Sequence, residues 1–149
     1  MARHEFRLTA DWNGGRNGEG TITAGNLQTK ISIPSEMKGP GIGTNPDEML
    51  IGAAATCYLI TLAAMLERKS IPVVSLTLET VGVVSVNKNG LQFESVTHYP
   101  HVVLGAEATA KHRKDAESFT EAAEKSCMIS NALRGNVDLS VQATVNRES

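Results

Sequence analysis

The chain has 149 residues and a formal net charge of -2, with 20% charged and 4% aromatic residues. Few aromatic residues, and no basic run longer than residues 111–114, disfavour a nucleic-acid-binding protein. A chain of this length most simply forms one domain, so we expect residues 1–149 to share a single core.

The first third of the chain predicts a small β-meander followed by a loop. Residues 5–12 alternate between apolar and polar side chains, as a half-buried strand does, and residues 20–24 and 27–33 predict two further strands. The sequence Gly-Gly-Arg-Asn-Gly at residues 14–18 is typical of a turn, because glycine and asparagine accept positive φ angles. Residues 34–43 contain two prolines and three glycines, which favours a loop.

A long helix is predicted over residues 46–69. Asn45 can cap it, Pro46 suits the first helical position, and Glu48 occupies the third position of a capping box. Residues 49–66 carry no charge, and the charged residues 67–69 with Pro72 beyond them predict an end near residue 70. At 1.5 Å per residue such a helix is about 36 Å long.

The apolar character of this helix runs all the way round it, which predicts burial on most sides or a place in a membrane. We favour burial, because the run is single and depends on alanine, glycine and threonine more than on large aliphatic residues. The small residues 52–55 allow another backbone to approach closely, so a second subunit can form part of the wall. We therefore expect no membrane span.

The remainder of the chain predicts strands and two further helices. Residues 74–86 form a β-branched alternating strand, residues 87–90 a hairpin turn, and residues 91–107 one or two strands with Pro100 at an edge or bend. Helical spacing returns over residues 115–126, a shorter helix is predicted over 127–133, and residues 137–145 predict a last strand. This order of elements indicates an α+β fold.

The chain contains two cysteines, Cys57 and Cys127. Residues 1–6 lack the apolar stretch of a signal peptide, so we expect a cytoplasmic protein. In that compartment two cysteines are more often reactive thiols than a structural disulfide.

Cys57 lies in the middle of the long helix, where the helix dipole gives little help and burial raises the pKa of a thiol. A reactive Cys57 therefore needs a cation from elsewhere, and Arg16 on the glycine-rich turn is the candidate. Asp47, ten residues before Cys57, is the candidate carboxylate to hold that guanidinium. The structural alternatives remain open: a small buried residue for Cys57, a solvated turn residue for Arg16, and favourable first-turn charges for Asp47 and Glu48.

Cys127 is expected near the start of the short helix, where thiolate formation is easier, although simple packing explains it equally well. No other chemistry has a comparable signal. No phosphate loop or dinucleotide fingerprint is present. The histidines match no metal-binding spacing and the serines no hydrolase motif, as holds for His98, His101, His112, Ser35, Ser126 and Ser130. We therefore predict neither a metal nor a bound cofactor.

Three stretches carry a resemblance to the OsmC/Ohr family of osmotically inducible and organic hydroperoxide resistance proteins. They are Gly-Gly-Arg-Asn-Gly at 14–18, Thr-Asn-Pro-Asp-Glu-Met-Leu at 44–50 leading to Cys57, and Ser-Cys-Met-Ile-Ser-Asn-Ala-Leu at 126–133, the last followed by Gly-Asn-Val-Asp-Leu at 135–139. Two cysteine motifs seventy residues apart are specific, and the resemblance covers nearly the whole chain.

The resemblance implies an OsmC-like fold, in which antiparallel sheets wrap around a long central helix in an intertwined homodimer. It also implies a peroxidase acting on alkyl or fatty-acid hydroperoxides without a metal or haem. In that role Cys57 attacks the peroxide and becomes a sulfenic acid, and Cys127 condenses with it to a disulfide. Arg16, held by Asp47, stabilises the Cys57 thiolate, and an external dithiol, in this family often a lipoyl group, restores the thiols.

The sequence departs from the family pattern at two places. Asp47 stands where the family usually has glutamate, and Glu48 can replace it only if the start of the helix rotates. Met128 stands where the family usually has proline. The alternative function is a redox-sensing or binding dimer whose cysteines do not turn over.

Overall fold

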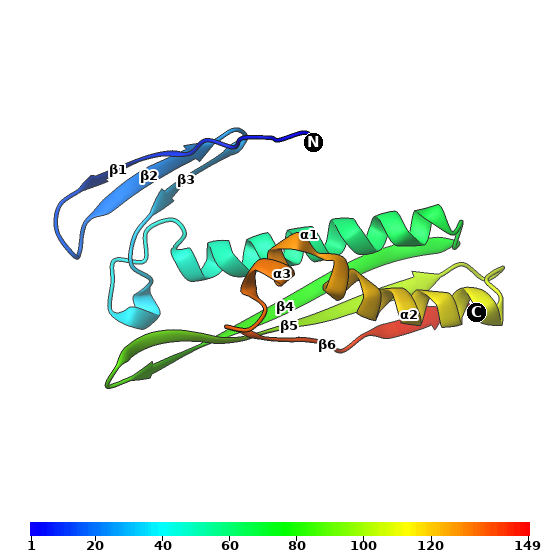
Figure 1. Cartoon of the computed structure of the whole chain (residues 1–149). Helices are drawn as coiled ribbons and strands as arrows, with labels where there is room; N and C mark the ends of the chain where they lie inside the picture. The colour runs from blue at the N-terminus through cyan, green and yellow to red at the C-terminus, as the bar shows by residue number, and fades with distance from the viewer. The chain divides into compact units, whose positions relative to one another are not determined.

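Seven strands and three α-helices follow one another in the computed structural model, which describes residues 1–149 (Figure 1). The chain divides into two units, residues Met1–Met49 and Leu50–Ser149, and each is described by itself. The single-domain expectation stays a prediction, while the α+β content agrees with the sequence.

The first unit is built on an antiparallel meander in the order β1-β2-β3. Its strands are β1 (Thr9–Asn13), β2 (Glu19–Ala24) and β3 (Leu27–Ile31), and a 3-10 turn at Ser35–Met37 follows them. The meander was predicted, but the half-buried first strand over residues 5–12 is wrong. Strand β1 begins only at Thr9 and is exposed throughout, because it is an edge strand and burial in this sheet falls on the central strand β2.

Helix α1 (Pro46–Arg68) starts and ends close to the predicted positions. The Asn45 Oδ1 atom accepts the Glu48 backbone N–H at 3.0 Å, which satisfies one free donor of the first turn. The Glu48 carboxylate accepts the Thr44 hydroxyl at 2.8 Å. At the other end, Ser70 adopts a left-handed φ of 53°, which stops the helix.

One face of α1 is buried within the chain, through Ala54, Tyr58, Leu62 and Leu66 at a spacing of four residues. The expectation of burial on most sides is therefore wrong for the single chain, because the opposite face has no element against it in the second unit. By length and composition α1 also qualifies as a membrane-crossing helix. Its buried stripe, however, packs into the core of the second unit, as the central helix of a globular fold does.

The sheet of the second unit is built on a long antiparallel hairpin of β4 (Val73–Asn87) and β5 (Gly90–Leu104), with β5 the central strand. The other edge of β5 pairs in parallel with β6 (Asp138–Val141) and β7 (Thr144–Arg147). The prediction of one last strand is thus wrong, since it is broken in two. Pro100 lies in β5 between the segment that pairs with β6 and the segment that pairs with β7, and proline has no N–H to donate there.

Helix α2 (Ala110–Ser126) and helix α3 (Met128–Leu133) form the connection from β5 to β6. Helix α2 begins five residues before the predicted start at Asp115. A capping box explains the difference: the Thr109 side chain accepts the His112 N–H, and the His112 ring accepts the Thr109 N–H at 3.0 Å. The usual partner in that motif is glutamate or glutamine, so the histidine hides the signal.

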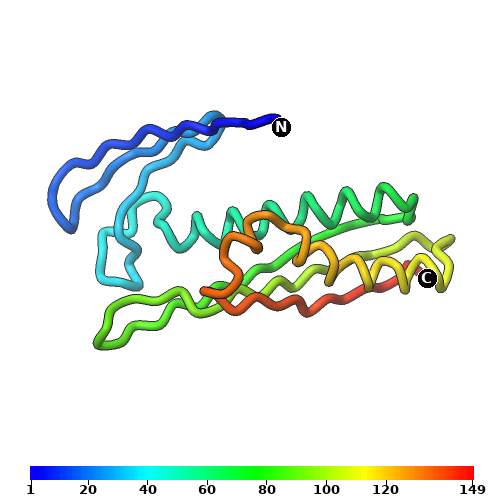
Figure 2. Tube along the Cα trace, in the orientation of Figure 1, coloured from blue at the N-terminus to red at the C-terminus, as the bar shows by residue number.

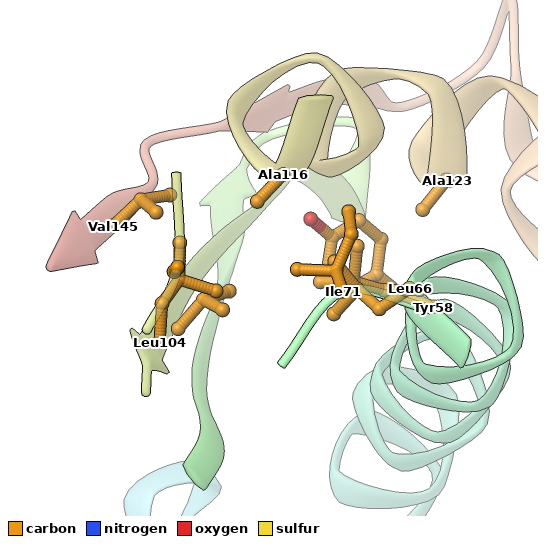
Figure 3. Close-up of a cluster of buried hydrophobic side chains, with 10 residues drawn as sticks. Tyr58, Leu66, Ile71, Leu104, Ala116, Ala123 and Val145 are labelled. Carbon is orange, nitrogen blue, oxygen red and sulfur yellow. The ribbon is translucent and has the colours of Figure 1, made fainter. Parts of the chain in front are cut away.

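The core of the second unit joins α1, α2 and the sheet. Figure 3 shows Ala116 and Ala123 of α2 directed toward Tyr58 and Leu66 of α1, with Leu104 and Val145 at the sheet. The small alanines leave room for the Tyr58 ring, whose hydroxyl reaches the Thr120 carbonyl of α2. Because this core fixes the rotation of α1, it also fixes where the neighbouring Cys57 side chain lies.

Candidate active site

Tyr58 is the buried residue that anchors the middle of α1. Its side chain is fully buried, its ring stacks on the His98 ring with centroids 4.5 Å apart, and its hydroxyl donates to the Thr120 carbonyl at 2.7 Å. Burial raises the pKa of the Tyr58 hydroxyl, and the nearby Glu121 and Glu124 carboxylates add to this. Tyr58 therefore acts as a neutral hydrogen-bond donor that holds the turn on which Cys57 lies.

Cys57 lies half-buried beside the start of α3. Figure 2 shows the orange α3 segment alongside the middle of α1, and the Cys57 thiol lies within hydrogen-bond reach of the Cys127 thiol and of the Ile129 and Met128 backbone amides. Both cysteines are free thiols. The structure thus brings together the two residues on which the predicted chemistry depends, from helices distant in sequence.

These donors determine the acidity of Cys57. Burial raises the pKa of the Cys57 thiol, but hydrogen bonds from Cys127, from the Ile129 and Met128 amides and from Thr61 outweigh burial, so the pKa lies below its ordinary value. The Thr61 hydroxyl also lies 2.7 Å from the Cys57 carbonyl. Because a hydroxyl has one hydrogen, Thr61 supports the thiolate only when it turns away from that carbonyl. The main support therefore comes from α3.

Cys127 is more deeply buried than Cys57, and its thiol pKa is shifted in the opposite direction. It is fully buried between α2 and α3, where it ends the first helix and caps the second, and its Sγ accepts the Ser130 N–H at 3.4 Å. Burial raises the pKa of the Cys127 thiol, the facing Cys57 raises it further, and the Ser130 hydroxyl and amide partly oppose the rise. The pair is therefore asymmetric, with Cys57 the better thiolate and Cys127 the proton-bearing neighbour.

Arg134 holds α3 against the end of α2. Its guanidinium lies 2.9 Å from the Glu124 carboxylate, donates to the Glu124 carbonyl at 3.3 Å and donates to Asn131 Oδ1 at 3.0 Å. The Glu124 side chain is only 8% exposed. The contact to Glu124 Oε1 has ion-pair distance but not hydrogen-bond geometry, so we treat it as a charge contact. Through it, the amides that face Cys57 are kept in place.

The other two predicted site residues, Arg16 and Asp47, belong to the first unit. The Arg16 guanidinium donates to the Met37 carbonyl at 2.9 Å, to the Lys38 carbonyl at 3.3 Å and to Asn17 Oδ1 at 3.1 Å. Within this unit Arg16 forms no ion pair with Asp47 or with Glu48. The roles of Arg16 and Asp47 beside Cys57 stay predictions.

Sequence reasoning missed the polar residues that lie around the cysteine pair. His98 and Ser130 were considered only as metal ligand and hydrolase nucleophile, and Glu124 and Arg134 were not considered. Glu124 gave a usable signal, because it shares one helical face with Ala116, Thr120 and Ala123, where a carboxylate is unexpected. No group of three or more His, Cys, Asp or Glu side chains is arranged to hold a metal ion.

Comparisons with known proteins add to this geometry. A family model described as OsmC-like protein matches residues 39–142. The chain is 52% identical over 145 residues to the uncharacterized protein YmaD of Bacillus subtilis (strain 168), covering 97% of each chain. It is 31% identical over 143 residues to the organic hydroperoxide resistance protein OhrB of the same strain, covering 95% of this chain and 98% of OhrB.

Two solved structures resemble most of the chain. The crystal structure of Bacillus subtilis OhrB matches with a TM-score of 0.68 at 24% identity, covering 93% of this chain and 98% of that one. The structure of the OsmC-like protein VCA0330 of Vibrio cholerae matches with a TM-score of 0.79 at 17% identity, covering 95% and 99%.

Proposed function

Because the chain belongs to the OsmC-like protein family and has the OsmC-like fold, we propose that it is a thiol-dependent peroxidase that reduces organic hydroperoxides to alcohols. The observation that carries the proposal is the facing pair of free thiols, in which Cys57 has a lowered pKa and Cys127 a raised one. A relative with the name organic hydroperoxide resistance protein supports the substrate class.

In the first step the Cys57 thiolate attacks the terminal oxygen of the hydroperoxide. The O–O bond breaks, Cys57 becomes a sulfenic acid and the alkoxide leaves. The alkoxide needs one proton to become the alcohol, and the Cys127 thiol next to Cys57 is the donor at hand. The same transfer leaves Cys127 as a thiolate, ready for the second step.

In the second step the Cys127 thiolate attacks the Cys57 sulfur. A disulfide forms, the S–O bond breaks, and hydroxide leaves and takes up a proton to become water. An external dithiol, of the lipoyl type in our proposal, then exchanges with the disulfide and restores both thiols while it becomes a disulfide itself. The cycle needs free thiols in its resting state, which suits a reducing compartment such as the cytoplasm.

Arg16 and Asp47 complete the proposed site. A guanidinium near Cys57 adds a fixed positive charge that further favours the thiolate and polarises the peroxide, and a carboxylate keeps that guanidinium oriented. To take this role Arg16 gives up its hydrogen bonds to the Met37 and Lys38 carbonyls, so that its guanidinium can bind the peroxide. The guanidinium is charged, but both bonds lie at the exposed surface, where water can replace them, so the free-energy cost of the exchange is modest.

We also propose that a second copy of this chain covers the open face of α1. That face carries Gly52, Ala53, Thr56 and Ala64 around Ile60, whose side chain is 65% exposed. The residues are uncharged and mostly small, so two copies of the helix can approach closely. Because Ala53 and Ile60 are helical neighbours of Cys57, a homodimer of this kind also provides apolar walls for an alkyl peroxide.

The experiment that tests the function mixes the reduced protein with one equivalent of cumene hydroperoxide and counts the free thiols, with hydrogen peroxide in parallel. We expect rapid loss of both thiols, a Cys57–Cys127 disulfide in the peptide map, and faster reaction with the organic peroxide. The Cys57→Ser variant should not react, whereas Cys127→Ser should consume one equivalent and stop at the sulfenic acid. Oxidation without turnover under excess dithiol would indicate a redox sensor instead, and two surviving thiols would contradict both readings.

A further inference from the structure

Ser130 has a hydroxyl that is fully buried and has no regular hydrogen-bond partner. The residue is completely buried in α3, and its Oγ makes no hydrogen bond of ordinary geometry. A buried hydroxyl without a partner is unfavourable, and such groups in native proteins call for an explanation. Simple packing does not provide one, because alanine fills nearly the same volume without the polar atom.

The neighbouring Cys127 thiol gives a reason for a hydroxyl at this buried position. The Ser130 backbone N–H already donates to the Cys127 Sγ atom at 3.4 Å, which places the Ser130 side chain on the same side of the turn. The hydroxyl also acts on Cys127 as a donor that lowers its pKa. A protonated thiol is a poor acceptor, whereas a thiolate is a strong one, so the hydroxyl lacks a partner only while Cys127 is protonated.

Both redox steps of the proposed cycle require Cys127 as a thiolate. It must be deprotonated to attack the Cys57 sulfenic acid. In the reductive step, Cys127 is fully buried and Cys57 is only half-buried, so an external thiolate can reach only the Cys57 sulfur. The S–S bond then breaks with its electron pair on the Cys127 sulfur, which leaves as a buried anion.

We propose that the Ser130 hydroxyl is a catalytic hydrogen-bond donor to the Cys127 thiolate, and that it favours this anion both when it attacks and when it leaves. The inference rests on the proposed function for its place in a peroxide cycle, while the contact itself is a property of the Ser130–Cys127 pair. The charged group that faces the Cys127 thiol from α1 is the Cys57 thiolate, which opposes a second negative charge. A neutral donor at Ser130 offsets that repulsion.

The first test measures the Cys127 thiolate directly, in full-length protein with the Cys57→Ser background, by its absorbance near 240 nm as the pH rises. Adding Ser130→Ala should raise the Cys127 pKa by about one pH unit, because a hydrogen bond to a charged group is lost. Ser130→Thr keeps the hydroxyl and should leave the midpoint unchanged. Should Ser130→Ala fail to fold, Ser130→Gly removes the same hydroxyl.

The second test follows the two chemical steps in protein with both cysteines. With Ser130→Ala, the Cys57 sulfenic acid should persist about threefold longer than in the wild type, since a tenfold loss of Cys127 thiolate is partly offset by its higher nucleophilicity. Trapping with dimedone and mass spectrometry measures this lifetime. Reduction of the diamide-oxidised protein by dithiothreitol should also slow about threefold, because Cys127 becomes a poorer leaving group.

Thr120→Val is the matched control, because its hydroxyl is buried in α2 and already donates to the Glu117 carbonyl at 2.6 Å. It should change neither the Cys127 pKa nor either rate. An unchanged Cys127 midpoint in Ser130→Ala would overturn the inference. Neither the titration nor the diamide experiment uses a peroxide, so an inert wild-type protein in the cumene hydroperoxide assay would overturn only the proposed function.

Discussion

Cys57 and Cys127 face each other with opposite shifts in thiol pKa. Cys57 is half-buried and Cys127 is fully buried, and burial alone would raise the pKa of both thiols. The difference arises because Cys57 receives hydrogen bonds from the Cys127 thiol and from the Ile129 and Met128 amides, which lower its pKa. The facing Cys57, in contrast, raises the pKa of Cys127. The start of α3 thus determines which of the two thiols is the more acidic.

The first prediction concerns the hydrogen bond from Cys127 to Cys57. Cys127→Ala removes this donor, so the pH midpoint for alkylation of Cys57 by iodoacetamide should move upward. Cys127→Ser retains an O–H donor and should keep the midpoint near that of the wild type. Mass spectrometry of the Cys57 peptide measures the rate at each pH, and equal midpoints in the alanine and serine variants would contradict the assignment.

The second prediction concerns the charge contact between Glu124 and Arg134. Arg134→Ala leaves a carboxylate that is only 8% exposed without its cation, so the free energy of unfolding should fall. Because Arg134 itself is 45% exposed, we expect a loss of about 2 kcal/mol, below the range for fully buried pairs. Urea denaturation measures it.

The exposed pair Arg113–Glu117 is the matched control for that experiment, and Arg113→Ala should change stability little. The double variant Glu124→Gln/Arg134→Ala should recover part of the lost stability, since it removes the unpaired buried charge. If the single and double variants are equally unstable, the charge contact is not the cause.

The third prediction concerns His98. Burial lowers the pKa of its imidazole, and the smaller effect of the Glu124 carboxylate opposes this. The unfolded chain therefore takes up the proton first as the pH falls, and the free energy of unfolding decreases below the unfolded pKa of about 6.5. Between about pH 7.5 and about pH 5.5 this residue should lower the free energy of unfolding, by at most about 1.4 kcal/mol. In His98→Asn the same comparison should give a flatter pH dependence.

The fourth prediction concerns the open face of α1. If a second copy covers this face, Ile60→Lys should shift the protein from dimer to monomer in sedimentation or light scattering, because a charge replaces the central apolar side chain. Val86, 75% exposed on the β4–β5 hairpin, is the matched control, and Val86→Lys should leave the assembly unchanged. A wild-type protein that is monomeric at all concentrations would contradict the proposed dimer.

Local signals in the sequence predicted most elements. The start of α1 followed from Asn45 and its end from the charged residues 67–69 with Pro72 beyond them, and α3 followed from the break near Cys127. Errors occurred where the structure depends on distant pairing. The break between β6 and β7 is set by Pro100 of β5, which no inspection of residues 137–145 reveals.

In the candidate site, too, local motifs were predicted from the sequence and contacts between distant segments were not. Cys57 and Cys127 were predicted from the motifs around them, and the structure places them together. Their electrostatic surroundings were not predicted: the sequence suggested a cation for Cys57, whereas the second unit provides neutral donors from α3. Backbone amides leave no mark in a sequence, because every residue except proline carries one.

The crossover from β5 through α2 and α3 to β6 has a consequence for how the protein matures. Parallel pairing of β5 with β6 joins residues far apart in the chain, such as Ser95 and Asp138, and contacts of this kind form late in folding. Until they form, Cys57 is an ordinary thiol without the α3 amides beside it. In the proposed cycle, Cys57 therefore becomes reactive toward peroxides only when the fold is complete.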